Sequence, residues 1–220
     1  MQPPRRFRLI VFDWDGTLVD STALIVSSLR EACRDLGVAL PDEAIARHVI
    51  GLGLEEALRQ GVPAVPRTRY PELAARYRHH YLGRDADVPL FAGVDAMLQE
   101  LEARGFLLAI ATGKSRRGLT RALEQQGVGG RFAATRCADE GFGKPHPGML
   151  WQLFEHTGVA PGDALMVGDT THDLELARNA GALALAVSYG AHPREGLAAR
   201  APLAVVDSPQ ALRSWLEANA

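Results

Sequence analysis

Residues 9–17 read LIVFDWDGT, four apolar residues followed at once by two acids with one residue between them. A short apolar run of this kind predicts a buried strand, with the acids at its carboxyl end. Ligands of open parallel sheets bind at that end of the strands. Two adjacent carboxylates repel each other unless a cation compensates them, and Mg²⁺ prefers oxygen ligands of this type. Asp13 and Asp15 are therefore candidate cation ligands, although a turn before Gly16 would also explain the pair.

The rest of the chain alternates apolar runs with helical patterns. Further strands are predicted at residues 106–111, 132–135, 164–167, 182–187 and 203–206. Helices are predicted at residues 94–104, 116–126, 147–157, 171–180 and 209–217. This alternation is typical of an α/β fold, and we predict a Rossmann-like, doubly wound parallel sheet.

One segment interrupts the alternation. Residues 20–87 carry amphipathic helical patterns but no convincing strand, and their glycines and prolines divide them into about four short helices. We therefore predict a helical cap at residues 20–87, inserted into an α/β core formed by residues 1–19 and 88–220.

Composition excludes several classes of partner. The formal net charge of -2 provides no general attraction for nucleic acid or for an anionic membrane. No apolar stretch is long enough to cross a bilayer, and Asp13 cuts the first apolar run short of a secretory signal. Cys33 and Cys137 lack metal-type spacing, which indicates reduced thiols. We expect a soluble cytoplasmic protein with no nucleic-acid or membrane partner; the sequence leaves its oligomeric state open.

Two other predicted strand ends carry polar residues. Thr112, Gly113 and Lys114 follow the strand at 106–111 and precede a helix, an arrangement that suits a phosphate cradle or an ordinary helix cap. Asp169 and Asp173 follow the strand at 164–167, where they could complete a magnesium site or cap the next helix.

Lysine is rare in this chain. All but two of the 24 basic residues are arginine, and the exceptions are Lys114 and Lys144. Lys144 lies in a Gly-Lys-Pro-His-Pro loop that its prolines make stiff. The scarcity of lysine favours a positioned ammonium at both places over a merely solvated one.

The four groups occur in an order that resembles the haloacid dehalogenase superfamily. The segment FDWDGTLVDS at residues 12–21 is followed by Thr112, by Lys144 before a proline, and by Gly168-Asp169 with Asp173. The chain is most similar to the phosphoglycolate phosphatase-like branch, which has a helical cap after its first motif. The resemblance implies a Mg²⁺-dependent phosphatase that hydrolyses a small phosphomonoester, with phosphoglycolate as the first substrate to test.

The same resemblance implies roles for four residues. Asp13 would attack phosphorus and become an aspartyl-phosphate. Asp15 would protonate the leaving group and then take a proton from the attacking water. Thr112 and Lys144 would hold the phosphoryl oxygens.

The cation ligands implied by the resemblance are Asp13, the backbone carbonyl of Asp15, and Asp169, with Asp173 as a supporting acid. An acid at position 15 also favours phosphoryl transfer over dehalogenation, because a departing halide needs no proton.

Substrate contacts are expected from the cap and from the second strand end. Gly113, Lys114 and Gly51 are the candidate substrate-binding residues, with Gly51 in the loop at residues 48–53. Arg47, His48 and Arg59 are nearby cations that could meet a substrate carboxylate.

Other activities would suit the same residues. A nucleotidase, a pyrophosphatase and a sugar-phosphate phosphatase or mutase would each use this scaffold. A non-catalytic phosphate-binding module is the alternative from a different class, although it would need neither nucleophile nor acid. In every case the expected partner is a small phosphorylated metabolite.

Overall fold

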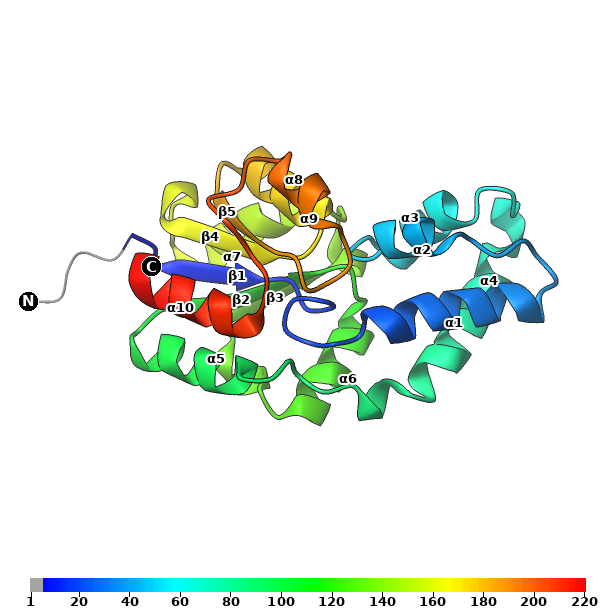
Figure 1. Ribbon diagram of the computed structural model, residues 1–220, viewed down its shortest axis with the longest axis horizontal. Coiled ribbons are helices and arrows are strands. Elements are labelled where there is room, and N and C mark those ends of the chain that lie inside the picture. Colours follow the sequence, from blue (N-terminus) through cyan, green and yellow to red (C-terminus); the bar gives the residue numbers. More distant parts are fainter. Residues whose placement is uncertain (1–5) are drawn as a thin grey trace, which may run out of the picture.

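A parallel six-stranded sheet forms the centre of the computed structural model, which describes residues 6–220 (Figure 1). The strand order is β3-β2-β1-β4-β5-β6. The strands are β1 (Leu9–Phe12), β2 (Leu107–Thr112), β3 (Ala134–Cys137), β4 (Ala164–Gly168), β5 (Leu183–Val187) and β6 (Val205–Val206). β1 pairs with β2 on one side and with β4 on the other. The residue after β1 therefore lies at the middle of the sheet's carboxyl edge.

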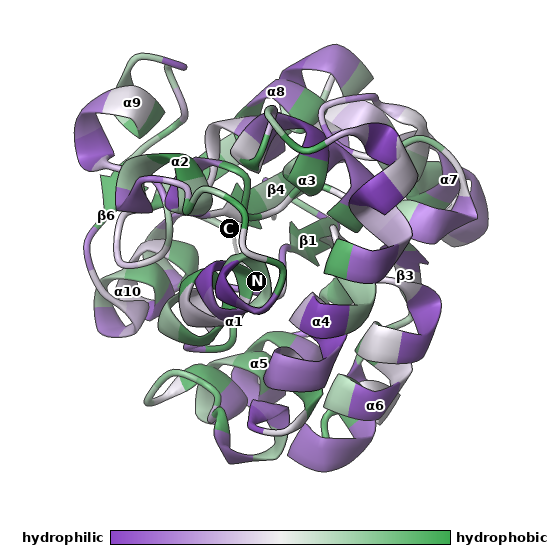
Figure 2. Cartoon of the chain, turned by 90° about the vertical axis from the view of Figure 1, so that its right-hand side faces the viewer, coloured by the Kyte–Doolittle hydropathy of each residue, from purple (hydrophilic) through white to green (hydrophobic). Residues whose placement is uncertain are grey.

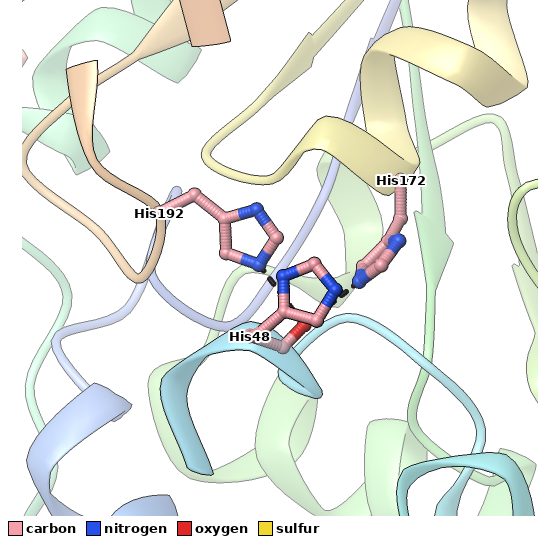
Figure 3. Close-up of side chains that lie close together, drawn as sticks. All are labelled: His48, His172 and His192. Carbon is pink, nitrogen blue, oxygen red and sulfur yellow. Dashed lines mark hydrogen bonds between the residues drawn. The ribbon is translucent and has the colours of Figure 1, made fainter. Parts of the chain in front are cut away.

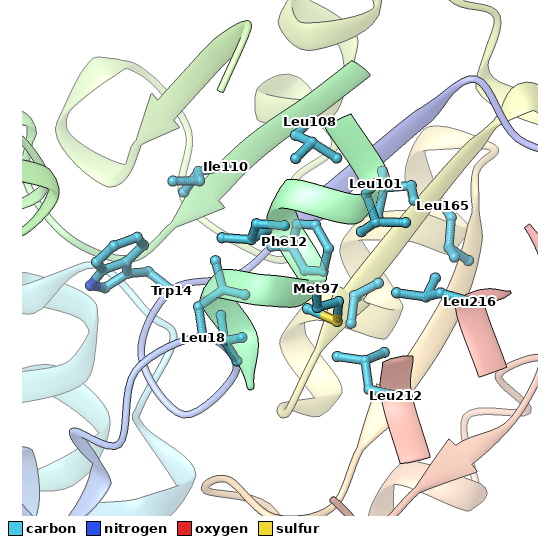
Figure 4. Close-up of a cluster of buried hydrophobic side chains, with 14 of the residues drawn as sticks. Phe12, Trp14, Leu18, Met97, Leu101, Leu108, Ile110, Leu165, Leu212 and Leu216 are labelled. Carbon is cyan, nitrogen blue, oxygen red and sulfur yellow. The ribbon is translucent and has the colours of Figure 1, made fainter. Parts of the chain in front are cut away.

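Helices cover both faces of this sheet. α5 (Val94–Ala103), α6 (Arg116–Gln126) and α10 (Pro209–Asn219) pack on one face, against a cluster that includes Ile10 and Phe12 (Figure 4). α7 (Gly148–Thr157) and α8 (Thr171–Ala180) pack on the other face, against Leu9 and Val11. Alternate residues of β1 thus enter opposite cores, as the two-residue period of a strand requires. The short α9 (Arg194–Ala198) packs beside α8 through Leu197.

The segment between β1 and α5 is helical and has its own core. It contains α1 (Thr22–Asp35), α2 (Glu43–His48), α3 (Leu54–Gly61) and α4 (Tyr70–Leu82), which we call the cap. The cap buries a separate apolar cluster that includes Leu29, Leu58 and Leu73. It lies beyond the carboxyl edge of the sheet (Figure 1), and hydrophilic residues predominate on the outer surfaces of α4 and α6 (Figure 2).

The predicted α/β fold is confirmed, and three details of the prediction were wrong. The strand expected at 203–206 is reduced to Val205–Val206 at the edge of the sheet, where it pairs with β5 alone. β3 begins two residues later than expected. α9 was not predicted, because five residues are too few to give a helical period. The division into core and cap at the stated boundaries stays a prediction, and residues 1–5 of that core lie outside the described residues.

Two further observations concern the described residues as a whole. Cys33 and Cys137 are buried free thiols. None of the helices in residues 6–220 is both long and apolar enough to cross a membrane.

Candidate active site

Asp13 is the first residue after β1 and is completely buried. Its backbone N–H donates to the carbonyl of Val167 (2.9 Å), which extends the pairing of β1 with β4 by one residue. Its Oδ2 is buried and accepts no hydrogen bond from any described residue. Burial raises the pKa of Asp13 well above its ordinary value, while Lys144 opposes that rise. A buried carboxylate oxygen without a donor is a position where a cation would be favourable.

Lys144 bridges two buried acids. Its Nζ lies 2.8 Å from Oδ1 of Asp13 and 2.7 Å from Oδ1 of Asp173, and the Lys144 side chain is fully buried. Burial alone would lower the pKa of Lys144, but the two carboxylates raise it above its ordinary value. The ammonium therefore keeps its proton at neutral pH. In the structure, Lys144 is therefore a buried charge with two fixed partners and not a solvated loop lysine.

Asp173 caps a helix, as one of the two interpretations of the sequence proposed, and also pairs with Lys144. Its Oδ2 accepts hydrogen bonds from the backbone N–H (3.0 Å) and the hydroxyl (2.7 Å) of Thr170, which caps α8. Its Oδ1 meets Lys144 at the same time. The carboxylate thus joins the start of α8 to the loop that carries Lys144.

Asp169 follows β4 and is held by donors on two sides. Oδ1 accepts from the hydroxyl of Thr17 (2.8 Å), and Oδ2 accepts from the backbone N–H of Ala191 (2.7 Å). A Cβ placed on Gly16 or on Gly190 would lie 2.3 Å from Oδ2 of Asp169, so neither position has room for a side chain. Burial, followed by the charge of Asp173, raises the pKa of Asp169 to about 7.

These acids form a group that can hold a divalent cation. Carboxylate oxygens of Asp13, Asp169 and Asp173 lie within 4.8 Å of one another. The donor set consists of hard oxygens. Burial, with the charges of neighbouring acids, raises the pKa values of Asp13 and Asp169, and a cation would offset both effects. The side chain of Asp15 lies outside this group.

Asp15 belongs to a second set of contacts, which faces the cap. Its Oδ1 accepts from the hydroxyl of Ser21 (2.7 Å) and lies 3.1 Å from Nζ of Lys114. The ammonium of Lys114 also donates to the phenol oxygen of Tyr81 (2.8 Å) and lies 4.7 Å from the centroid of that ring. Lys114 therefore connects an acid of the core to α4 of the cap.

The cap loop lies directly on the second strand end. A Cβ on Gly113 would come within 2.5 Å of the carbonyl oxygens of Gly51 and Leu52, so only glycine permits this approach. Gly51 has φ +88°, and a Cβ there would lie 3.2 Å from the hydroxyl of Thr170. Both Gly51 and Gly113 line a cavity of about 1260 Å³ between cap and core, together with Asp15, Lys114, Lys144, Tyr77 and Tyr81.

Three of the proposed substrate cations lie elsewhere. Arg47 pairs with Glu43 (3.1 Å), and Arg59 pairs with Glu56, in both cases on an exposed helix surface. Neither arginine lines the cavity, and the same is true of His48. The sequence could not orient these side chains, because the order of short helices does not fix the face that each turns inward.

Other residues of the site were missed by the sequence analysis. Thr17 donates a hydrogen bond to Asp169, and Ser21 donates one to Asp15. Both donors lie in the FDWDGTLVDS segment that suggested the family. Tyr81 and His192 had no such signal, because they meet Lys114 and the carbonyl of Asp169, respectively, only through tertiary packing.

Comparisons with known proteins identify the family of this chain. The model of the haloacid dehalogenase-like hydrolase family matches residues 10–187. The "Probable phosphatase IndB" of Dickeya dadantii is 36% identical over 206 residues, covering 91% of this chain and 89% of that protein. The phosphoglycolate phosphatase of Vibrio cholerae is 32% identical over 218 residues, covering 92% and 94%.

A solved structure gives the same answer for the fold. The structure of a predicted phosphoglycolate phosphatase from Haemophilus somnus has a TM-score of 0.83 and 25% identity, covering 92% of this chain and 95% of that chain. The family match extends over most of the sequence, and both relatives share more than 30% of their residues with it. On these grounds the protein belongs to the haloacid dehalogenase-like hydrolase family.

Proposed function

We propose that this protein is a Mg²⁺-dependent phosphatase that hydrolyses a small phosphomonoester through an aspartyl-phosphate on Asp13. The observation that carries the proposal is the buried carboxylate of Asp13, whose Oδ1 faces Lys144 at 2.8 Å while Oδ2 has no donor. A carboxylate in an ordinary structural role would have its oxygens satisfied. An unsatisfied carboxylate at the carboxyl edge of the sheet favours a reactive or cation-binding role over a structural one.

The reaction has two steps. First, a carboxylate oxygen of Asp13 forms a bond to phosphorus as the bond between phosphorus and the leaving oxygen breaks, and Asp15 gives that oxygen its proton. Next, Asp15 takes a proton from water, whose oxygen attacks phosphorus and releases inorganic phosphate and the Asp13 carboxylate. Asp15 is suited to both proton transfers because it lines the cavity and lies outside the buried group of acids.

The phosphoryl oxygens would be held by Thr112, the backbone N–H of Gly113, and Lys144. Thr112 is the last residue of β2 and is fully buried at the carboxyl edge of the sheet, directly before Gly113. Mg²⁺, held by Asp13, Asp169 and the carbonyl of Asp15, would supply the remaining positive charge. Without these charges, bringing a phosphate to a carboxylate costs several kcal/mol at low dielectric.

The leaving group would lie toward the cap, next to Lys114 and Tyr81. Phosphoglycolate is our first candidate, because its carboxylate matches the ammonium of Lys114 and because the Vibrio cholerae relative is a phosphoglycolate phosphatase. The cavity of about 1260 Å³ would also admit a larger leaving group, such as a nucleoside or a sugar. Cytoplasmic location and the absence of nucleic-acid and membrane partners remain part of this proposal.

The test is phosphate release from phosphoglycolate and from a panel of nucleotides, sugar phosphates and pyrophosphate. Wild type and Asp13→Asn are assayed with Mg²⁺ and with chelator. We expect turnover that requires both Mg²⁺ and Asp13, and the order of the panel identifies the leaving group. A folded protein that hydrolyses no member of the panel would contradict the proposal and favour a mutase or a phosphate-binding module.

A further inference from the structure

The last residue of the cap helix α2 presents its carbonyl group to the core. The final carbonyls of a helix have no partner within that helix and need donors from elsewhere. The carbonyl oxygen of His48 accepts from Nε2 of His172 (2.8 Å) and from Nε2 of His192 (3.0 Å), as Figure 3 shows. Both donors come from the core, His172 from α8 and His192 from the loop after β5. The core thus supplies two N–H groups to one atom of the cap.

The surroundings fix which nitrogen of His192 carries the proton. Nδ1 of His192 accepts from the backbone N–H of Thr171 (3.0 Å), so the proton lies on Nε2 and points to His48. Burial lowers the pKa of His192 to about 4 and also lowers the pKa of His172. Both rings are therefore neutral donors near neutral pH.

Three neighbouring histidines suggest a metal site, but the geometry argues against one. A metal bound at Nε2 of His192 would need the proton on Nδ1, where the N–H of Thr171 already points. The rings of His48 and His192 are stacked, with centroids 4.9 Å apart and planes 17° apart, so they do not face a common point. The two buried imidazoles act as hydrogen-bond donors in this arrangement.

The carbonyl that they hold stands at the start of the loop that covers the phosphate site. Residues 49–53 follow His48 directly, and the carbonyls of Gly51 and Leu52 lie against Gly113. On the core side, the backbone N–H of His192 donates to the carbonyl of Asp169 (3.3 Å). A continuous set of contacts therefore runs from a candidate cation ligand to the cap loop.

We propose that His172 and His192 are positioning residues that fix the cap loop, residues 49–53, over the phosphate site. Their two hydrogen bonds replace the missing partners at the end of α2 and determine where the chain leaves that helix. Without them the loop would move away from Gly113, and the pocket around the phosphate would be less well closed. The catalytic consequence rests on the proposed phosphatase activity, whereas the structural consequence does not.

The first test measures backbone hydrogen exchange of the full-length protein without substrate. The amides of Val49, Ile50 and Leu52 donate to the carbonyls of Ile45, Arg47 and Val49, so their exchange reports on the order of the loop and of the helix end before it. In His172→Phe/His192→Leu we expect their exchange to be about tenfold faster or more, because two hydrogen bonds to the carbonyl are lost. Exchange in the central strands should not change. The single variant His172→Gln retains an N–H donor at this position and should therefore keep most of the protection that wild type shows.

His156→Phe is the matched control, since His156 is exposed near the end of α7 and lines no part of the cavity. If the double variant does not fold, His172→Phe alone is used, and we expect the exchange rate of the same loop amides to increase severalfold. Unchanged exchange at residues 49–53, or equal acceleration in the central strands, would overturn the proposal.

The second test uses turnover. His172 lines the cavity itself, so the turnover test uses His192→Leu, whose side chain lies outside the lining. We expect KM for the best phosphomonoester to rise severalfold in this variant while kcat changes less, because the loop positions substrate and does no chemistry. A loss confined to kcat would overturn the proposal. If wild type hydrolyses no phosphomonoester, the proposed function fails, and hydrogen exchange still decides the role of the two histidines.

Discussion

The carboxyl edge of the sheet has two sides that are built differently. On the core side, four residues of the α/β part of the chain are at most 3% exposed: Asp13, Lys144, Asp169 and Asp173. On the cap side, Asp15 and Lys114 meet Tyr81 of α4, and the Lys114 side chain is 12% exposed. Contacts of the first kind follow from strand order, because parallel strands bring their ends together. Contacts of the second kind depend on how an inserted helical segment is seated.

This difference predicts that the core side tolerates substitution least. Replacing Lys144 leaves Asp13 and Asp173 without their shared cation, which costs about 3–5 kcal/mol in a buried site. We expect Lys144→Met to lower kcat about 10³-fold. Lys144→Arg should not restore it, because the guanidinium is larger and planar. Steady-state kinetics, with circular dichroism to verify folding, measures both variants.

The matched control is Arg178→Lys, the reverse exchange at an exposed position on α8, which should leave kcat unchanged. Near-wild-type turnover of Lys144→Arg would show that the core side needs only a positive charge, and the contrast between the two sides would lose its basis.

Substitutions on the cap side should reduce the preference for phosphoglycolate more than they reduce the catalytic reaction itself. We expect Lys114→Met to reduce kcat/KM for phosphoglycolate about 10–100-fold, and Tyr81→Phe about tenfold, as is usual for hydrogen bonds to charged groups. For 2-hydroxyethyl phosphate, which lacks the carboxylate, both losses should be smaller. The measurement is kcat/KM for the two substrates. Tyr70→Phe on the same helix, outside the cavity lining, is the control.

Equal losses of kcat/KM for both substrates would mean that Lys114 and Tyr81 support Asp15 and do not recognise the leaving group. In that case substitutions on the cap side would affect the reaction itself, as we expect for the core side.

The smallest expected effect is on stability. The pKa of Asp169 is raised to about 7, so between roughly pH 4 and pH 7 the folded state binds more protons than the unfolded state. Without a divalent cation, the contribution of this group therefore makes the free energy of unfolding fall as pH rises through that range. Mg²⁺ should compensate the ionised acids, so it should raise Tm by a few degrees at pH 7.5 and by less at pH 5.5.

Thermal melts with Mg²⁺ and with chelator at the two pH values measure this difference. In Asp169→Asn the dependence of the Mg²⁺ effect on pH should weaken. An effect of Mg²⁺ that is the same at both pH values in wild type would place the cation outside the buried acids.

The sequence predicted the core side well for a physical reason. A strand followed by Asp13, and another followed by Asp169, suffice to put the two acids near each other once the sheet is parallel. Lys144 was singled out because lysine is scarce in this chain. Tyr81, His172 and His192 were not assigned their contacts, because these depend on the seating of α2 and α4 rather than on local pattern. The length of β6 was overestimated and α9 was not predicted, because so few residues give no measurable hydrophobic period.

The placement of the two lysines also has a practical consequence. Amine-directed reagents meet only these two lysine side chains on the protein: that of Lys144 is fully buried, and that of Lys114 is 12% exposed and lines the cavity. Acylation of Lys144 therefore requires separation of cap and core or local unfolding, whereas Lys114 is accessible only to a reagent that enters the cavity. The rate of Lys144 labelling, followed by mass spectrometry, measures the opening of the site, and any molecule that fills the cavity should slow the labelling of Lys114.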